Sequence, residues 1–441
     1  MPPLDPINLP IVTIDPTFPA VIGDVHAGIV PSEKFWVSCY KTAQPSVHAK
    51  IQAELDDKDR NLMHLKAIEG EVGIQRGSDG VFRVACPPLG MQPTPVLPPM
   101  QEYLDPERSN PQHPQRITAF DISPDSTRFA TGFLDGSVFL YPVSPFAPVS
   151  IYPAHGPPSQ ITTPPTAARP HLSTTTNLQF FRSSRALLSA GADFSLSILP
   201  ADLSPSSTRI TPTHTLRGHT RPITATVILG AGHEILSTSL DGTLKFWNTS
   251  ISSTPVLSIP SFASQPILSA ALGTDQMLWC GLQDGSIQLF DLRRERPAFR
   301  CAPSGAGGVA ALAHDAGHHL LAAGSTAGVV RMFDTRVLGA DTGGTGEVTS
   351  FVRGRGGIES LAFVQRAQGE GEAGGLDVVV ATADGLPYVA AVLPDGPGVS
   401  AELVGGDCDA VRCVRARSVE EGSGWDVWSA GDDAVVRRWR I

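Results

Sequence analysis

The sequence predicts an all-β protein, and three observations lead to that prediction. Gly (43 residues) and Pro (39 residues) are abundant without a collagen-like period, which is typical of many short strands joined by turns. A hydrophobic content of 41% against 17% charged residues allows a large core. Most of the chain also repeats one short pattern, in which two strands flank a tight turn. The predicted fold therefore depends on how this pattern recurs.

The stretch STSLDGTLKFWNT, residues 237–249, contains the repeated pattern in full. Ser237 lies four residues before Asp241, and Trp247 lies six residues after it. The dipeptide DG is a strong signal for a tight turn between two strands. Aligning similar turns predicts seven units, whose turn positions are Asp135, Asp193, Asp241, Asp284, Ala327, Asp384 and Asp433.

A histidine precedes the turn aspartate by 22 residues in three of these units. We expect a buried hydrogen-bonded chain, in which the aspartate accepts from the imidazole, the imidazole meets a Ser or Thr hydroxyl, and the hydroxyl can meet an indole N–H. The last unit offers a hydroxyl, an aspartate and a Trp at the same positions. The residues expected in these structural networks are His113, Thr131, Asp135, His171, Ser189, Asp193, His219, Ser237, Asp241, Trp247, Ser429, Asp433 and Trp439.

The pattern resembles the WD repeat, with GH at Gly218 and His219 and with FD at 290–291 and 333–334 in place of WD. This resemblance implies a β-propeller of four-stranded blades, and seven units imply seven blades. The fifth and sixth units lack most of the polar positions, so we expect apolar packing to hold those blades. The sequence ends within the third strand of the last blade, so another segment is expected to supply its outer strand.

Residues 1–111 do not follow the repeat. VHAKIQAEL (47–55) alternates apolar and polar residues, which predicts a half-buried strand. KFWVSCYK (34–41) and GVFRVACP (80–87) are further strand candidates, and the Pro-rich stretch 91–114 is expected to be an extended connector. We therefore expect a small β-rich N-terminal unit with its connector over residues 1–111 and the seven-bladed propeller over residues 112–441.

Composition and motifs argue against several classes of function. The net charge of −10 argues against nucleic acid as a partner, and no apolar run of about 18 residues is present that could span a membrane. The six cysteines are scattered without a CxxC pair, which favours reduced thiols in a cytoplasmic and nuclear protein. GxSxG, P-loop and HExxH motifs are absent, so we expect no enzyme activity and no cofactor.

The histidines of HDAGHHL (His314, His318 and His319) suggest a metal site at first sight. They lie between two predicted strands, which favours a polar hairpin tip. The turn aspartates do not suggest calcium loops, because each turn carries one carboxylate where calcium needs several oxygen ligands. We therefore expect no metal site.

The stretch LVGGDCDAVRCV (403–414) aligns with LRGHTRPITATV (216–227) of the third unit. This alignment places Asp407 and Asp409 in the loop that enters the last blade, and Asp432 beside the turn on the same face. Two interpretations remain open. The carboxylates form either a solvated acidic loop or a partner-binding patch for a basic protein.

Three stretches carry a closer resemblance: FWVSCYKTAQPSVHAKI (35–51), GLQDGSIQLFDLRRERPA (281–298) and ELVGGDCDAVRCV leading to DDAVVRRWRI (402–441). They resemble the proteasomal ATPase-associated factors, WD-repeat chaperones that assemble the base of the proteasome regulatory particle. The resemblance implies binding to the C-terminal domain of a base ATPase subunit, delayed docking of that subunit on the core particle, and indirect association with other base assembly factors. The alternative is a generic WD-repeat adaptor, such as a substrate receptor of a ubiquitin ligase.

Overall fold

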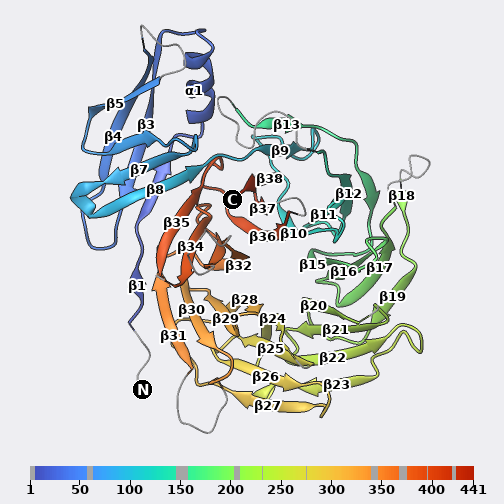
Figure 1. Cartoon of the computed structure of the whole chain (residues 1–441). Coiled ribbons are helices and arrows are strands. Elements are labelled where there is room, and N and C mark those ends of the chain that lie inside the picture. Colours follow the sequence, from blue (N-terminus) through green and yellow to red (C-terminus); the bar gives the residue numbers. More distant parts are fainter. Residues whose placement is uncertain are drawn as a thin grey trace.

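The structure is a computed structural model that describes residues 5–56, 63–145, 157–202, 209–230, 232–274, 276–338, 346–366, 375–394, 396–419 and 424–441. These residues form eight sheets and one short α-helix, so the chain is all-β (Figure 1). No helix in these ranges has the length and apolar character needed to cross a membrane.

Seven of the sheets share one plan of four antiparallel strands, and we call them repeat sheets 1 to 7 in chain order. Repeat sheet 1 comprises β10 (Ile117–Ile122), β11 (Arg128–Phe133), β12 (Val138–Pro142) and β14 (Thr166–Ala168). Repeat sheet 2 comprises β15 (Thr175–Phe180), β16 (Ala186–Gly191), β17 (Ser195–Pro200) and β19 (His214–Arg217). Repeat sheet 3 comprises β20 (Ile223–Leu229), β21 (Glu234–Ser239), β22 (Thr243–Asn248) and β23 (Leu257–Pro260). Repeat sheet 4 comprises β24 (Ile267–Leu272), β25 (Met277–Leu282), β26 (Ile287–Asp291) and β27 (Arg296–Arg300).

The remaining repeat sheets include segments from outside the repeat. Repeat sheet 5 comprises β28 (Val309–Asp315), β29 (Leu320–Ser325), β30 (Val329–Asp334) and β31 (Glu347–Val352), with β1 (Ile7–Asn8) added in parallel. Repeat sheet 6 comprises β32 (Ile358–Gln365), β33 (Leu376–Thr382), β34 (Tyr388–Leu393) and β35 (Gly398–Leu403). Repeat sheet 7 comprises β36 (Val411–Ser418), β37 (Trp425–Gly431), β38 (Val435–Arg440) and β9 (Gln101–Leu104). Two short strands, β13 (Ser159–Ile161) and β18 (Arg209–Ile210), add in parallel to β9 and β14.

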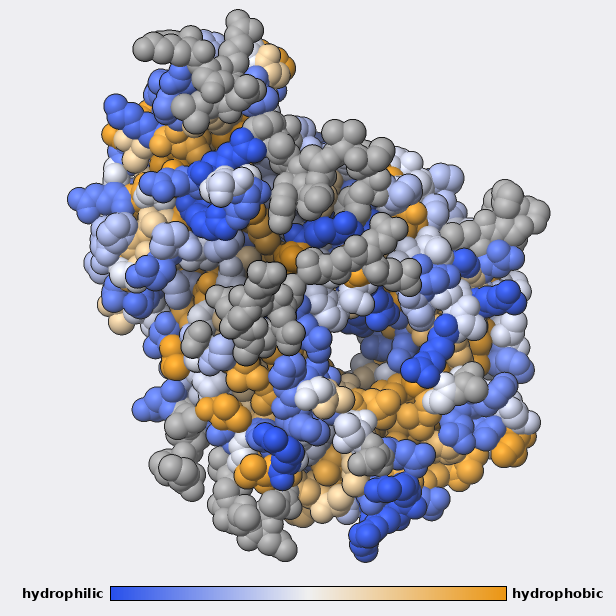
Figure 2. All heavy atoms as spheres, viewed as in Figure 1, coloured by the Kyte–Doolittle hydropathy of each residue, from blue (hydrophilic) through white to orange (hydrophobic). Residues whose placement is uncertain are grey.

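The repeat sheets are arranged around a central opening, which is visible in both views (Figures 1 and 2). The first strand of each repeat sheet contacts the first strand of the next, and β36 also contacts β10. Each turn expected from the sequence lies between the second and third strands of its sheet. This arrangement of an all-β chain fits a β-propeller.

The middle strands of the repeat sheets are buried on both faces. All seven residues of β33 are buried, for example, and the apolar run LDVVVAT supplies the side chains. Such runs are expected where a strand is covered on both sides. One cluster joins Val330 of repeat sheet 5 to Val378 of repeat sheet 6, so the core lies between neighbouring sheets as well as within them.

The outer strand of repeat sheet 7 comes from the segment expected to be a connector. β9 pairs antiparallel with β38, with Gln101 opposite Arg438 and Leu104 opposite Val435. Repeat sheet 7 therefore contains residues from both sides of the expected boundary at residue 111.

The N-terminal segment forms a sheet of β2 (Ile11–Ile14), β3 (Ser32–Tyr40), β4 (Val47–Leu55) and β5 (Met63–Glu69). β4 matches the strand predicted from VHAKIQAEL. The helix α1 (Phe18–His26) was not predicted, although its buried residues Phe18, Val21, Ile22 and Val25 follow the helical spacing. This apolar stripe packs with Phe35 and Val37 in one core cluster.

A second group of strands joins this segment to repeat sheet 6. β6 (Gly73–Arg76), β7 (Phe82–Cys86) and β8 (Met91–Leu97) are consecutive neighbours, with the short 3-10 helix η1 (Pro87–Leu89) between the last two. β8 pairs in parallel with β35, which gives a seven-stranded sheet. The N-terminal strands are therefore continuous with a repeat sheet.

Candidate functional site

The third repeat unit contains a complete buried polar network. His219 Nδ1 lies 2.8 Å from Asp241 Oδ2, and its Nε2 lies 2.7 Å from Ser237 Oγ. Trp247 Nε1 donates to the same hydroxyl over 2.8 Å. Although burial acts to raise it, hydrogen bonds from His219 and Thr243 hold the pKa of Asp241 far below its ordinary value. The network fixes the loop before β20 against the turn between β21 and β22.

The second unit contains the same network without the Trp. His171 Nδ1 lies 3.0 Å from Asp193 Oδ1, and its Nε2 lies 2.8 Å from Ser189 Oγ. Buried Leu199 occupies the Trp position. Burial lowers the pKa of His171, which favours the neutral imidazole, while the charge of Asp193 opposes this effect. Because the same residues recur at the same place in two sheets, their role is architectural.

The first unit departs from the expected network. His113 is exposed, so it does not enter a buried chain with Thr131 and Asp135, and the expectation for this histidine is wrong. Asp135 instead accepts from the backbone N–H of Ser137 over 3.0 Å. Tyr141 donates its hydroxyl proton to Asp105 over 2.7 Å. A histidine 22 residues before the turn reaches the turn aspartate only where the chain between them follows the same path as in repeat sheets 2 and 3. The chain after His113 does not follow that path.

The last unit also departs from the expected network. Trp439 donates its indole N–H to the carbonyl of Leu97 over 3.1 Å, so it does not bond to Ser429. Asp433 forms an ion pair with Arg437. The Trp439 bond ties repeat sheet 7 to the segment that contains β8 and β9. No local pattern predicts the Trp439 contact, because Leu97 and Trp439 are 342 residues apart.

The acidic residues at the edge of repeat sheet 7 have different environments. Asp407 and Asp409 are exposed. Asp432 is bound by Arg412 through two contacts of 2.9 and 2.8 Å, and its side chain is only 12% exposed. The guanidinium of Arg412 neutralises the Asp432 carboxylate, which therefore attracts a basic partner only weakly. The expected role of Asp432 in partner binding is not supported.

Asp409 lies among other negative charges. Its pKa is raised by partial burial and by the neighbouring carboxylates of Asp433, Asp407 and Asp432. A Cβ on Gly385 would lie 2.6 Å from the Asp409 carbonyl, so the loop rests directly on the turn between β33 and β34. We call Asp407 and Asp409 the acidic pair.

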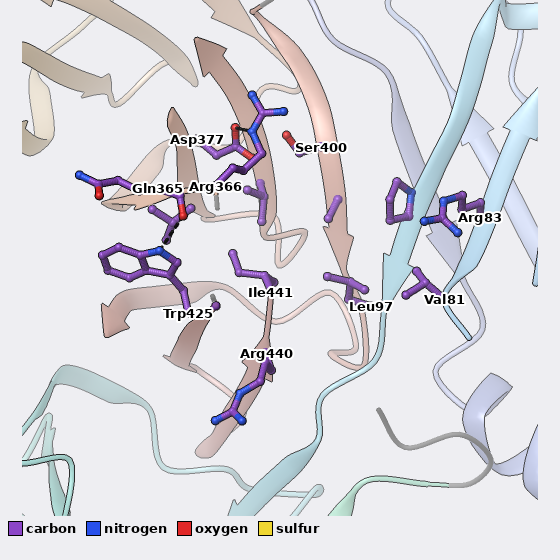
Figure 3. Close-up of a pocket in the computed structure, with 15 residues that line it drawn as sticks. Val81, Arg83, Leu97, Gln365, Arg366, Asp377, Ser400, Trp425, Arg440 and Ile441 are labelled. Atoms are coloured by element: carbon purple, nitrogen blue, oxygen red, sulfur yellow. Dashed lines mark hydrogen bonds and ion pairs between the residues drawn. The ribbon is translucent and has the colours of Figure 1, made fainter. Parts of the chain in front are cut away.

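A cavity of about 300 Å³ lies where β7, β8 and repeat sheets 6 and 7 meet (Figure 3). Buried Asp377 is part of the lining, 3.0 Å from Nε of Arg366. Trp425 also lines the cavity, and its indole N–H donates to the carbonyl of Gln365 over 2.7 Å. The rest of the lining is mainly aliphatic, with Val81, Leu97, Val364, Val389 and Ile441 among the residues. Among the residues that the structure describes, neither His nor Cys lines the cavity, and sequence reasoning did not anticipate it.

Metal-binding potential is absent from the described ranges. No group of three or more His, Cys, Asp or Glu side chains there could hold a metal ion. His318 and His319 lie in the turn between β28 and β29, where His318 Nδ1 is 2.9 Å from Asp315 Oδ2.

Two parts of the chain, residues 105–141 and 210–248, match the family model for the WD domain, G-beta repeat. The chain carries WD repeats. The second match contains the complete network of His219, Ser237, Asp241 and Trp247, and the first runs from Asp105 to Tyr141, the pair that is hydrogen bonded. No curated protein matches the chain. WD-repeat proteins are generally non-catalytic, so the repeats indicate a scaffold for protein interactions.

Proposed function

We propose that the chain is an assembly chaperone for the base of the proteasome regulatory particle. It would bind the C-terminal domain of one base ATPase subunit and delay docking of that subunit on the core particle. The resemblance of residues 35–51, 281–298 and 402–441 to proteasomal ATPase-associated factors supports this role, and the WD repeats are consistent with it. The protein would act in the cytoplasm and nucleus, without enzyme activity and without nucleic acid or membrane as a partner.

We also infer that the seven repeat sheets are the blades of one propeller. Contact between β36 and β10 supports closure between the last and first sheets. Asp121 of β10 supports it further, because it accepts from Arg415 Nε in β36 over 3.1 Å and from the Phe180 N–H in β15 over 2.8 Å. One carboxylate therefore connects repeat sheets 7, 1 and 2.

The exposed acidic pair is the observation that carries the binding proposal. Asp407 and Asp409 lie close together, and partial burial together with the nearby carboxylates raises the pKa of Asp409. A basic protein surface would relieve this repulsion. Complementary charge chiefly increases the association rate and the specificity of a complex. The ATPase domain would therefore present Lys or Arg to this loop, and binding would sterically delay docking on the core particle.

Capture of partners by the tagged full-length chain tests the proposal. The protein would be incubated with lysate, and the bound proteins would be identified by mass spectrometry. Base ATPase subunits with their assembly factors are the expected result, followed by titration with the purified ATPase C-terminal domain. Recovery of cullin-type ligase components without ATPase subunits would overturn the chaperone role in favour of the adaptor alternative.

A further inference from the structure

The cavity where β7, β8 and repeat sheets 6 and 7 meet has the size and composition of a small-molecule site. Its volume of about 300 Å³ is at the lower end of the range for such sites. Most of its lining is apolar, and Leu97, Val364, Val389 and Ala401 contribute from four different strands. Walls of this kind favour a ligand with an aliphatic body, because binding removes apolar surface from water.

Asp377 and Ser400 form what we call the polar corner of this lining (Figure 3). Asp377 is only 3% exposed, and its Oδ1 lies 3.0 Å from Nε of Arg366 but accepts no hydrogen bond from the described residues. Ser400 Oγ is also shielded from solvent, and it makes no hydrogen bond within the same ranges. Burial raises the pKa of Asp377, while the nearby Ser400 hydroxyl and the Arg366 charge lower it. Buried polar atoms are normally hydrogen bonded, so two open ones at one place indicate room for a partner.

The guanidinium of Arg366 is fixed beside the polar corner. Its Nη2 donates to the carbonyl of Leu393 over 2.7 Å, and the backbone N–H of Arg366 donates to the carbonyl of Gly375 over 2.8 Å. A Cβ on Gly375 would lie 2.5 Å from Nε of Arg366, so the side chain rests on this glycine. The polar corner is therefore positioned before any ligand binds.

The charges around the cavity select a neutral ligand. Each charged side chain of the described lining has a partner of opposite charge within 3.0 Å. A cationic ligand at the polar corner would meet Arg366, and an anionic ligand would meet Asp377. Neither would find an unpaired opposite charge to offset the loss of its own hydration. The ion pairs are Arg83 with Asp79, Arg366 with Asp377 and Arg440 with Asp426.

The open polar atoms match a single hydroxyl group better than a polypeptide segment. Each buried peptide unit brings an N–H and a C=O that both need partners. Within the described lining, only Asp377 Oδ1 and Ser400 Oγ are shielded side-chain polar atoms without a hydrogen bond. One hydroxyl can serve both of them, because it donates one proton and also accepts.

We propose that the cavity binds a neutral aliphatic molecule that carries one hydroxyl group. The aliphatic body would lie against Leu97, Val364 and Val389. The hydroxyl would donate to Oδ1 of Asp377 and accept from the hydroxyl of Ser400. This site goes beyond the proposed function, because it involves neither the acidic pair nor the ATPase domain.

Four probes that share one carbon skeleton test the ligand chemistry. Menthol, menthone, menthylamine and menthane carboxylic acid would each be titrated into the full chain by calorimetry at neutral pH. Menthol should bind most tightly. Menthone should bind about three- to tenfold more weakly, because its carbonyl cannot donate to Asp377. The amine and the acid, which are charged at this pH, should also bind more weakly than menthol.

Removal of one hydroxyl tests the polar corner. Ser400→Ala should weaken menthol binding by about three- to tenfold, the effect expected for one hydrogen bond. Ser258→Ala is the matched control, because Ser258 is exposed in β23, which occupies the place in repeat sheet 3 that β35 occupies in repeat sheet 6. This control should bind menthol like wild type.

Filling the cavity tests its location. Val81 is half-buried in the lining, so Val81→Trp should prevent menthol binding. Val348→Trp is the control, because Val348 is 50% exposed in β31, away from the lining, and this variant should bind like wild type. Urea midpoints show whether each variant folds. Ser400→Ala and the probe series keep the test valid if Val81→Trp does not fold.

Several results would overturn the inference. These are no measurable binding of menthol, equal affinity for all four probes, or tighter binding of a charged probe than of menthol. Menthol binding that neither Ser400→Ala nor Val81→Trp changes would place the probe outside this cavity and would overturn it as well. None of these titrations contains the ATPase domain, so the proposed function is decided separately by its own capture experiment.

Discussion

Arg353 and Glu402 form a buried ion pair that also holds the N-terminal segment. One guanidinium nitrogen of Arg353 lies 2.7 and 2.6 Å from the two carboxylate oxygens of Glu402. Arg353 Nε donates to the carbonyl of Pro10 over 3.0 Å, and Glu402 accepts from the N–H of Val12 over 3.1 Å. The pair therefore connects β2 and the residue before it to repeat sheets 5 and 6.

Replacing Arg353 with Met should strongly destabilise the protein. The change leaves the Glu402 charge buried without its partner, which costs about 3–5 kcal/mol. Arg336→Met is the control, because Arg336 is 66% exposed and its pair with Asp334 should contribute little to stability. Urea unfolding of both variants measures the difference. Equal losses of unfolding free energy in both variants would show that the buried pair contributes no more than the exposed pair.

The histidine networks predict a contrast between His219→Ala and His113→Ala. Removing the imidazole of His219 takes one hydrogen-bond partner from Ser237 and one from Asp241 in a buried site, which should cost roughly 1–3 kcal/mol of unfolding free energy. His113 occupies the same place in the sequence pattern but is exposed, so its replacement should have almost no effect. Urea midpoints of the two variants decide the matter, and a similar loss in both would contradict the structure.

Acidification should destabilise repeat sheet 2 through His171. Burial lowers the pKa of this histidine in the folded protein, so the unfolded chain takes up the proton more readily. Its contribution is present above the ordinary histidine pKa of about 6.5 and is lost as the pH falls below that value. His171→Gln should remove this part of the pH dependence. Urea midpoints between pH 5 and 7.5 test it, and parallel curves for both proteins would contradict the assignment.

Reversing the charge of the acidic pair should weaken binding to the ATPase domain. Asp407→Lys with Asp409→Lys should reduce affinity by about tenfold or more at low salt, because like charges at an interface cost several kcal/mol. Wild-type affinity should fall as salt rises, since exposed charges are screened beyond about 8 Å at physiological ionic strength. The double variant should show a smaller or reversed dependence.

The control for this experiment is Glu69→Lys with Glu71→Lys. Both glutamates are exposed in the N-terminal segment, and their reversal changes the net charge by the same amount. Titrations at two salt concentrations should show near wild-type binding for this control. If both double variants lose affinity equally, net charge rather than the acidic pair governs binding.

Sequence patterns predicted the repeated turns and strands, but not the contacts that other segments of the chain make with them. The turn positions could be found because DG turns and strand alternation are local signals. The spacing of His171 and His219 from their aspartates identified pairs that the structure joins. His113 shows the limit of this reasoning, because spacing carries no information about the path of the intervening chain.

The missed features depend on contacts between distant residues. Pairing of β8 with β35 is a parallel register of two residue pairs, Glu402 with Val96 and Leu403 with Leu97, which no local pattern encodes. Residues 91–114, which were expected to form a connector, contain β8 and β9. These strands form because they pair with the edge strands β35 and β38 of repeat sheets 6 and 7. The aliphatic cavity likewise depends on tertiary packing. The Gly-rich stretch 365–375 has too few apolar residues to pack, which predicts a dispensable loop, and residues 367–374 of it lie outside the described residues.

Pairing of β9 with β38 imposes an order on folding during synthesis. The bond between Gln101 and Arg438 joins residues 337 positions apart. While the ribosome translates the intervening repeats, β9 has no β38 to pair with, and its backbone groups remain an open edge. Long-range strand pairing is slow, and open edges favour association with other chains. Expression should therefore be sensitive to translation rate and to general folding chaperones, although each repeat sheet is built mainly from local hairpins.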